Sequence, residues 1–359
     1  MYRLKASFLA LALVFLTSFS AFASGGHDEH GELEEFVPGD VIIHHVLDNH
    51  EIHIGNFHIP LPIILWDKAN GGLVGPFSSS NLRDGANYNG YVMSHEKIYF
   101  VGDAELKHDA EGHIDAPKPL DFSITKAVAG VFITSILLIL IFMAVAKGYK
   151  KREGQAPKGI QSALEPLIVF VRDEIAKPSI GPKYQKFLPF LLTVFFFIWI
   201  ANLLGLIPFI GGFNVTGNIA VALVLALLTF IITAANGNKD YWMHIFWTPG
   251  VPWWLKVPVP LMFIIEFIGF LSKPIVLMLR LFANITAGHI IILAFVSLIF
   301  IFNNLYGAGG GFGVSVVSVI FSIFMFCIEL LVAFLQAYVF TLLSALYFGS
   351  AVEEHAHEH

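Results

Sequence analysis

The sequence is poor in charge and nearly devoid of cysteine. Charged residues make up 13% of its 359 positions and hydrophobic residues 56%, whereas a soluble domain has about 25% charged residues. This composition excludes an ordinary soluble globular protein and indicates a membrane protein. The one cysteine, Cys327, excludes an intrachain disulfide. Because it lies in an apolar run, we expect it to be a small core residue.

Several chemical signatures are also absent. The sequence has no Gly-x-x-x-x-Gly-Lys-Ser/Thr loop for nucleotide phosphates. Residues 24–120 carry 16 acidic and 5 basic side chains, so no basic surface for nucleic acid exists there. The ten histidines of this part, such as His44/His45 and His53/His58, match no tight metal-ligand spacing, nor do the three in the last five residues. We expect no cofactor, no metal and no nucleic-acid partner.

The N-terminus resembles an export signal. Arg3 and Lys5 precede an apolar stretch, and Ala21-Phe22-Ala23 forms a small-x-small cleavage pattern, so residues 1–23 are expected to be a signal peptide, with an uncleaved anchor as the alternative. Residues 24–120 then form a small, partly ordered, acidic and His-rich domain outside the cytoplasm. Alternating segments at 40–44 and 52–59 favour strands within it.

Residues 121–359 are expected to form an all-α polytopic membrane domain with about five membrane-embedded helices. Four basic residues at positions 147–152 follow the first apolar run and mark its end as cytoplasmic. The expected helices lie at about 124–147, 160–177, 187–206, 218–235, 258–303 and 312–348. This topology places the N-terminal domain in the periplasm and the C-terminus in the cytoplasm of a bacterial inner membrane.

The helix expected at 160–177 has one apolar stripe. Its members are Leu164, Leu167, Ile168, Val171 and Ile175. We expect this helix to lie on the cytoplasmic membrane surface, or to pack against a neighbouring soluble domain.

The last two apolar runs are too long for a simple crossing. At about 1.5 Å per residue they extend roughly 65 and 55 Å, about twice the ~30 Å hydrocarbon thickness. They are joined by the glycine-rich segment 307–311, which we expect to be a connection between an antiparallel, steeply tilted pair. Such a pair exposes a long lateral surface that suits contact with a protein neighbour.

Four charges lie inside these long runs: Glu266, Lys273, Arg280 and Glu329. An arginine at mid-membrane costs roughly 2.5–3.5 kcal/mol on insertion scales, which points to function. Glu266, Lys273 and Arg280 are seven residues apart and Asn284 follows four later, so they share one face of a helix.

The register of the pair follows from index sums. In an antiparallel pair, residues at one level have a nearly constant sum, which is 616 for Arg280 with Gln336 and 618 for His289 with Glu329. Both polar pairs fit one register, although His289 lies nine residues beyond Arg280 and therefore on nearly the opposite side of a straight helix. A carboxylate and an imidazole exchange protons near neutral pH, whereas arginine cannot relay protons. The alternative for Glu329 and His289 is a buried polar pair that only fixes helix packing, and the alternative for Arg280 is a pairing with helix carbonyls or with Glu266.

The run from Leu271 to His289, LSKPIVLMLRLFANITAGH, and the segment Leu335–Phe340, LQAYVF, resemble the signature of subunit a of F-type ATP synthases. The resemblance covers about residues 120–354. It implies a stator arginine, Arg280, facing a rotor ring of c-type subunits, with Asn284 and Gln336 as polar neighbours. It further implies that Glu266, His289 and Glu329 line half-channels, and that peripheral-stalk b-type subunits and the rest of the complex are partners.

Two departures from the family pattern qualify this resemblance. The acid and the histidine are exchanged between positions 289 and 329 relative to some bacterial members, and an aspartate often found in the first hairpin is absent around residues 202–208. The expected function is a non-catalytic, proton-translocating stator subunit, with proton rather than sodium as the default ion. The rival hypotheses are a secondary transporter with Arg280 as an anion-binding residue, and an intramembrane enzyme, for which no sufficient set of residues is visible.

Overall fold

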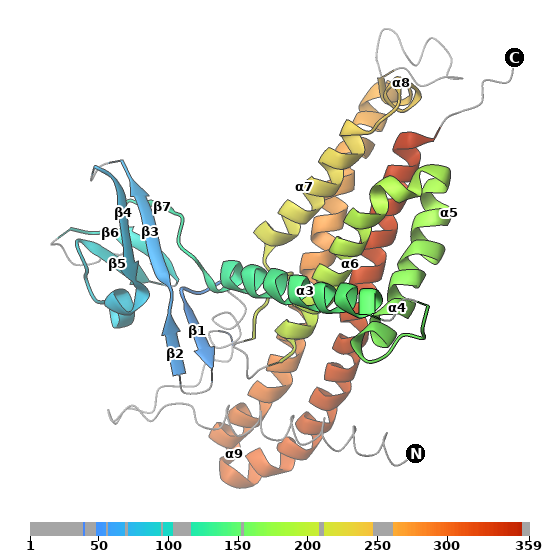
Figure 1. Cartoon of the computed structure of the whole chain (residues 1–359). Helices are drawn as coiled ribbons and strands as arrows, with labels where there is room; N and C mark the ends of the chain where they lie inside the picture. Colours follow the sequence, from blue (N-terminus) through green and yellow to red (C-terminus); the bar gives the residue numbers. More distant parts are fainter. Residues whose placement is uncertain are drawn as a thin grey trace, which may run out of the picture. The chain divides into compact units, whose positions relative to one another are not determined.

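A computed structural model describes residue 39 and residues 48–54, 57–68, 71–94, 96–102, 116–151, 154–207, 212–246 and 261–353 (Figure 1). The chain divides into two compact units. One contains Met1–Val131, Leu204–Phe213 and Ile290–Phe326, and the other contains Phe132–Leu203, Asn214–His289 and Cys327–His359. The expected signal peptide, the strand expected at 40–44 and the tail histidines lie outside the described residues.

Short antiparallel strands build the N-terminal part of the first unit. β1 (Glu51–Ile54) pairs antiparallel with β2 (Phe57–Pro60), which confirms strands in the alternating segment at 52–59. A three-stranded sheet has the order β4 (Gly72–Ser78), β3 (Pro62–Asp67), β7 (Leu120–Asp121). β5 (Tyr91–Ser94) pairs with β6 (Lys97–Phe100). The core between these pieces consists of Ile63, Leu65, Leu82, Tyr91 and Ile98.

A buried histidine and a carboxylate join distant parts of this domain. The Nε2 atom of His50 lies 2.8 Å from Asp121 Oδ2, and the backbone N–H of Ser123 donates to Asp121 Oδ1 at 2.8 Å. Burial alone raises the pKa of Asp121, but the hydrogen bonds from His50 and Ser123 outweigh it and lower the net pKa below its usual value. The carboxylate therefore stabilises the folded domain in its ionised form.

The first long helix, α3 (Lys126–Lys151), is apolar through its middle and ends at the basic Lys150 and Lys151, as the sequence predicts. Its start is fixed to the N-terminal domain. Asp48 accepts a hydrogen bond from the backbone of Ala127 at 2.9 Å, which caps a free N–H of the first turn. Asn49 accepts one from the backbone of Lys126 at 2.7 Å.

The segment expected to be one surface helix contains three helical pieces. α4 (Ile160–Phe170) continues as a π-helical turn, Val171–Ala176, and then as α5 (Lys177–Ile180). The predicted stripe packs into the core of the second unit, where Val171 and Ile175 are fully buried. The stripe therefore packs against other helices of this chain.

α6 (Tyr184–Gly205) and α7 (Ile219–Ala235) confirm the two apolar runs expected there. A further helix, α8 (Lys239–Phe246), follows α7 and is bent by 106° from it. Asn238 fixes the start of α8 by bonding the backbone of Ala351 and Val352 at the end of the chain's last helix.

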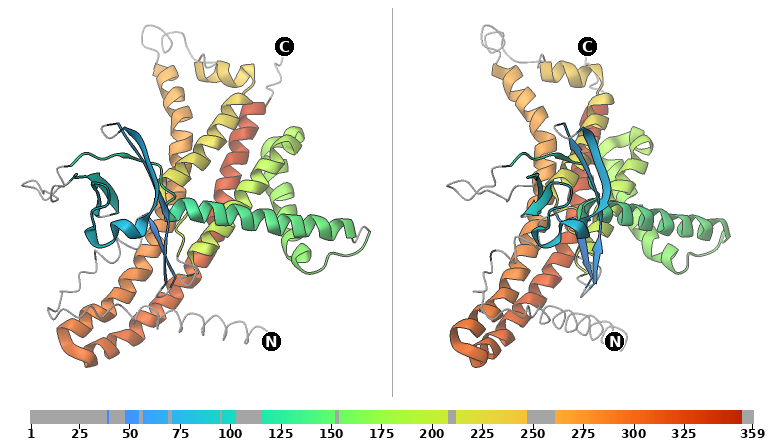
Figure 2. Two further views of the ribbon diagram at one scale, coloured as in Figure 1. Left: turned by 60° about the vertical axis from the view of Figure 1, so that its left-hand side comes forward. Right: turned by 90° about the vertical axis from the view of Figure 1, so that its left-hand side faces the viewer.

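The last helix, α9 (Leu261–Val352), contains both long apolar runs and reverses direction at Gly307 (Figures 1 and 2). Gly307 has φ 70° and ψ −171°, and helix continues on either side. The expected glycine-rich connection between the two runs is confirmed in its place, but the break is confined to Gly307 and the glycines after it are helical. Phe295 stacks on Phe321 across the tip, with ring centroids 5.5 Å apart.

Leu261–His289 form the first arm of α9 and Cys327–Val352 the second arm, both in the second unit. The core of this unit joins them to α4 through α7 by way of buried residues such as Leu191, Phe195, Leu281 and Phe340. Cys327 is exposed on the second arm, so the core position expected for it is wrong. Its helix turns this small side chain outward.

Within the described residues, three helices are long and apolar enough to cross a membrane, or four when the bent pair α7 and α8 counts as one span. This supports a polytopic, mostly helical membrane protein, in which every strand of the described ranges lies in the N-terminal domain.

Candidate functional site

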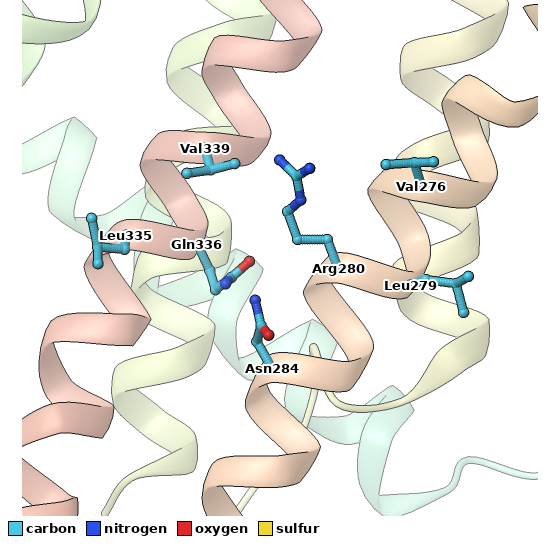
Figure 3. Close-up of a pocket in the computed structure, with 7 residues that line it drawn as sticks. All are labelled: Val276, Leu279, Arg280, Asn284, Leu335, Gln336 and Val339. Atoms are coloured by element: carbon cyan, nitrogen blue, oxygen red, sulfur yellow. The ribbon is translucent and has the colours of Figure 1, made fainter. Parts of the chain in front are cut away.

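The site expected around Arg280 lies between the two arms of α9. Arg280 and Asn284 come from the first arm and Gln336 from the second, and all three line one pocket with four aliphatic residues, Val276, Leu279, Leu335 and Val339 (Figure 3). The side chains of Asn284 and Gln336 point toward each other, while the guanidinium of Arg280 extends toward Val339. The predicted register of Arg280 with Gln336 is thus confirmed.

The surroundings of Arg280 are apolar and open to the side. Val276, Leu279 and Leu335 are exposed, and so is Arg280 itself, whereas Gln336 is buried. Among the described residues, none forms a hydrogen bond or an ion pair with Arg280. The expected alternative, a pairing with Glu266, does not form, because Glu266 Oε2 lies instead 3.9 Å from His244 Nδ1.

The second predicted pair also forms. His289 Nδ1 lies 3.4 Å from Glu329 Oε1, which confirms the common register. Glu329 is 4% exposed, and neither of its carboxylate oxygens accepts a hydrogen bond within the described part of the chain. The distance fits an ion pair, but its geometry is not that of a hydrogen bond. This carboxylate is therefore held by packing.

Gly288 explains how Glu329 reaches His289 despite the unfavourable angle. A Cβ atom at position 288 would lie 2.9 Å from Glu329 Oε1 and 3.1 Å from its Cδ. The missing side chain therefore leaves the space in which the carboxylate crosses the first arm. Sequence reasoning missed Gly288, and the only available signal was a glycine inside a helix beside a titratable residue.

A buried polar contact on α6 was also missed. Asn202 Nδ2 donates to the backbone oxygen of Ala333 at 3.2 Å, and Thr216 Oγ1 donates to Asn202 Oδ1. Both side chains are buried. Ala333 lies one turn after Glu329, so this contact fixes the second arm next to the carboxylate. A lone asparagine in an apolar run was the signal, since membrane-buried amides need partners.

At the beginning of the first arm, the remaining members of the polar stripe face aromatic residues and α8. Lys273 Nζ lies 3.4 Å from the hydroxyl of Tyr241, and it lies over the rings of Tyr241 and Tyr347. Tyr347 belongs to the second arm, so Lys273 faces the same way as Arg280 and Asn284. The prediction of a shared face is confirmed for these three residues, and Glu266 contacts His244 of α8, the same helix that contributes Tyr241 to Lys273.

These features define a class of protein. The chain is a polytopic membrane protein with a laterally open arginine pocket on a long helical hairpin and a buried carboxylate beside a histidine. A family model described as ATP synthase A chain matches residues 129–349. A second model, described as Domain of unknown function (DUF8433), matches residues 41–122.

Individual relatives agree with the first model. The chain is 43% identical over 277 residues to ATP synthase subunit a of Chloroherpeton thalassium, covering 73% of this chain and 79% of that protein. It is 48% identical over 237 residues to ATP synthase subunit a 2 of Chlorobaculum tepidum, covering 64% of each. With ATP synthase subunit a of Chlorobium phaeobacteroides it shares 37% over 343 residues, covering 94% of this chain and 81% of that protein. The chain belongs to the F-type ATP synthase subunit a family.

Proposed function

We propose that this chain is the proton-conducting stator subunit of an F-type ATP synthase, coupling proton flow to rotation of a ring of c-type subunits. In this role it lies in a bacterial inner membrane, contacts peripheral-stalk b-type subunits and performs no ATP chemistry itself. The N-terminal domain, residues 24–120, is then periplasmic, the C-terminus is cytoplasmic, and residues 1–23 are the signal that exports the domain.

The observation that carries this proposal is the environment of Arg280. A guanidinium stays charged, so an apolar setting in which no carboxylate of the described residues pairs with it is unfavourable unless a partner supplies the negative charge. The pocket opens sideways between exposed aliphatic residues, Val276, Leu279 and Leu335. A carboxyl group on a neighbouring transmembrane helix fits this opening. Asn284 and Gln336 then act as uncharged polar neighbours of the ion pair.

The two other polar sites supply the two half-channels. Glu329 and His289 exchange protons on the periplasmic side and deliver them to the rotor carboxylate. Glu266, beside His244, lines the cytoplasmic exit, while Lys273 belongs to the polar stripe between that exit and Arg280. Arg280 keeps the arriving rotor carboxylate ionised and prevents direct leakage between the two paths, because it cannot release its proton.

The test is replacement of Arg280 with Ala in the assembled enzyme, reconstituted into vesicles. We expect proton-driven ATP synthesis and ATP-driven proton pumping to be lost, because the rotor carboxylate loses its cationic partner. The matched control is Arg172→Ala, which removes an arginine that pairs with Asp173 outside the pocket. That variant should keep both activities. Normal ATP-driven pumping by assembled Arg280→Ala enzyme would contradict the proposal.

A further inference from the structure

The three-stranded sheet of the N-terminal domain has an apolar outer face. Trp66, Leu73, Leu120 and Phe122, which we call the sheet patch, are 42%, 65%, 60% and 64% exposed. The other face of the same sheet carries the buried Ile63 and Leu65. An antiparallel sheet with one buried face ordinarily presents polar residues on the other. An apolar face of this kind marks an interaction surface.

The strand register makes the sheet patch continuous. Trp66 lies directly opposite Leu73 on β4 and opposite Leu120 on β7, so the three side chains project from the same face. The backbone N–H of Phe122 donates to the backbone oxygen of Ile64 at 2.9 Å, which extends this register by one pair beyond β7. Phe122 therefore projects on the same side as Trp66.

The sheet patch lies next to the start of a membrane helix. Only four residue steps separate Phe122 from Lys126, the first residue of α3, and they span at most about 14 Å. The start of α3 is held to the domain, because Asp48 and Asn49 accept hydrogen bonds from the backbone of its first turn. α3 then presents exposed apolar residues such as Phe132 and Ile136. The sheet patch is therefore close, along the chain, to the point where the apolar part of α3 begins.

We propose that the sheet patch rests on the lipid interface of the membrane at the point where α3 enters it. An aromatic ring with a polar N–H, such as Trp66, suits the headgroup level, and Leu73, Leu120 and Phe122 suit the boundary with the acyl chains. The contact with lipid is expected to be apolar and not electrostatic, because residues 24–120 carry 16 acidic and only 5 basic residues. Anionic lipids would repel such a domain, so its lipid contact persists at high salt and needs no anionic lipid.

The experiment uses the assembled ATP synthase in vesicles of zwitterionic phospholipid. Cys327 is first replaced with Ser, and single cysteines are introduced by Leu73→Cys and Phe122→Cys and labelled with an environment-sensitive fluorophore. Lys97→Cys is the control, because Lys97 is an exposed polar residue on β6, outside the three-stranded sheet. Quenching is measured with lipids spin-labelled near the headgroup and with aqueous iodide, at low and high salt.

We expect the labels at 73 and 122 to show blue-shifted emission, quenching by the spin-labelled lipid and weak quenching by iodide, equally at both salt concentrations. The label at 97 should show the opposite pattern. Two results would overturn the proposal. Labels at 73 and 122 that iodide quenches as strongly as the label at 97 would show a face open to water. Protection from both quenchers would show that another subunit covers the patch.

Discussion

The position of the Glu329 carboxylate depends on the absence of a side chain at Gly288. Glycine is the only residue type that leaves space at position 288 for Oε1 of Glu329 beside His289. A Cβ atom added at this position would approach Oε1 to 2.9 Å. The carboxylate itself has no hydrogen bond within the described residues and is held by packing. Its position is therefore sensitive to a single methyl group.

Gly288→Ala should accordingly displace the end of Glu329 from His289, because this end is the flexible part of the contact. If the pair lies on the proton path, proton-driven ATP synthesis by the reconstituted enzyme falls several-fold, which corresponds to roughly 1 kcal/mol in the limiting barrier. Gly269→Ala is the matched control, because nothing lies within 4 Å of a Cβ at that position of the same arm. Equal rates of ATP synthesis in both variants would show that the position of Glu329 beside His289 does not affect proton flow.

Asp121 gives a prediction for pH. Its pKa in the folded state lies below its usual value of 3.8, because the hydrogen bonds from His50 and Ser123 outweigh burial. The ionised group therefore stabilises the folded N-terminal domain above about pH 4, and this contribution is lost as the pH falls through the lower, folded-state pKa. Hydrogen exchange of residues 48–54 and 116–122 in the full chain should thus increase steeply in acid.

Asp121→Asn is the comparison for that measurement. It should raise exchange at neutral pH and flatten the increase in acid, because the asparagine side chain does not ionise. An unchanged acid profile in this variant would show that other carboxyl groups determine the acid sensitivity of the domain.

At the scale of elements, the long hairpin depends on one backbone conformation. Gly307, at φ 70° and ψ −171°, occupies a region that is essentially restricted to glycine, and nothing lies within 4 Å of a Cβ there. The turn therefore requires glycine because of this backbone conformation, and not because a side chain would collide with its neighbours. The two arms reach their common register through this reversal.

Gly307→Ala should destabilise the hairpin by about 1–3 kcal/mol, the usual cost of this conformation for other residues. The free energy of unfolding in mixed micelles, followed by loss of helical signal, measures it. Gly309→Ala provides the control, because Gly309 is helical and also has nothing within 4 Å of its Cβ, so the substitution should be neutral or stabilise by up to about 1 kcal/mol. A similar loss in both variants would show that the turn does not require a glycine conformation.

Periodicity was sufficient to predict most helices of the chain, including α3, α6 and α7, because a helix repeats locally and leaves a local pattern of apolar residues. It was not sufficient for α4 and α8. The stripe on α4 correctly indicated a buried face, but the pattern is the same whether a membrane, a soluble domain or the chain's own helices cover it. The end of α9 anchors α8 through Asn238, and no local pattern records such an anchor.

At the scale of the whole molecule, distant polar contacts hold the second unit together. Asn202 on α6 bonds Ala333 on the second arm of α9, 131 residues away, and receives the hydroxyl of Thr216. Thr286 on the first arm donates to the backbone of Gly217 at 3.3 Å. The end of α6, the residues before α7 and both arms of α9 thus meet near Glu329.

Asn202→Ala should destabilise the folded protein by about 1–3 kcal/mol, because it leaves buried partners without their hydrogen bonds. Thr193→Ala serves as its control, since Thr193 is an exposed residue of the same helix whose hydroxyl bonds only the backbone of Pro189. Unfolding of the purified chain in micelles distinguishes them. Equal stability of the two variants would show that the contact to the second arm contributes nothing.

The sequence by itself determined the membrane class, the positions of the long apolar helices and the register that pairs Arg280 with Gln336 and His289 with Glu329. These properties follow from composition and from the constant rise and period of a helix. Only the tertiary structure decided that Gly288 makes room for Glu329, that Asn202 fixes the second arm, that Cys327 is exposed and that the three-stranded sheet has an apolar outer face. Each of these depends on how closely distant segments approach, and side-chain spacing within one segment does not contain that distance.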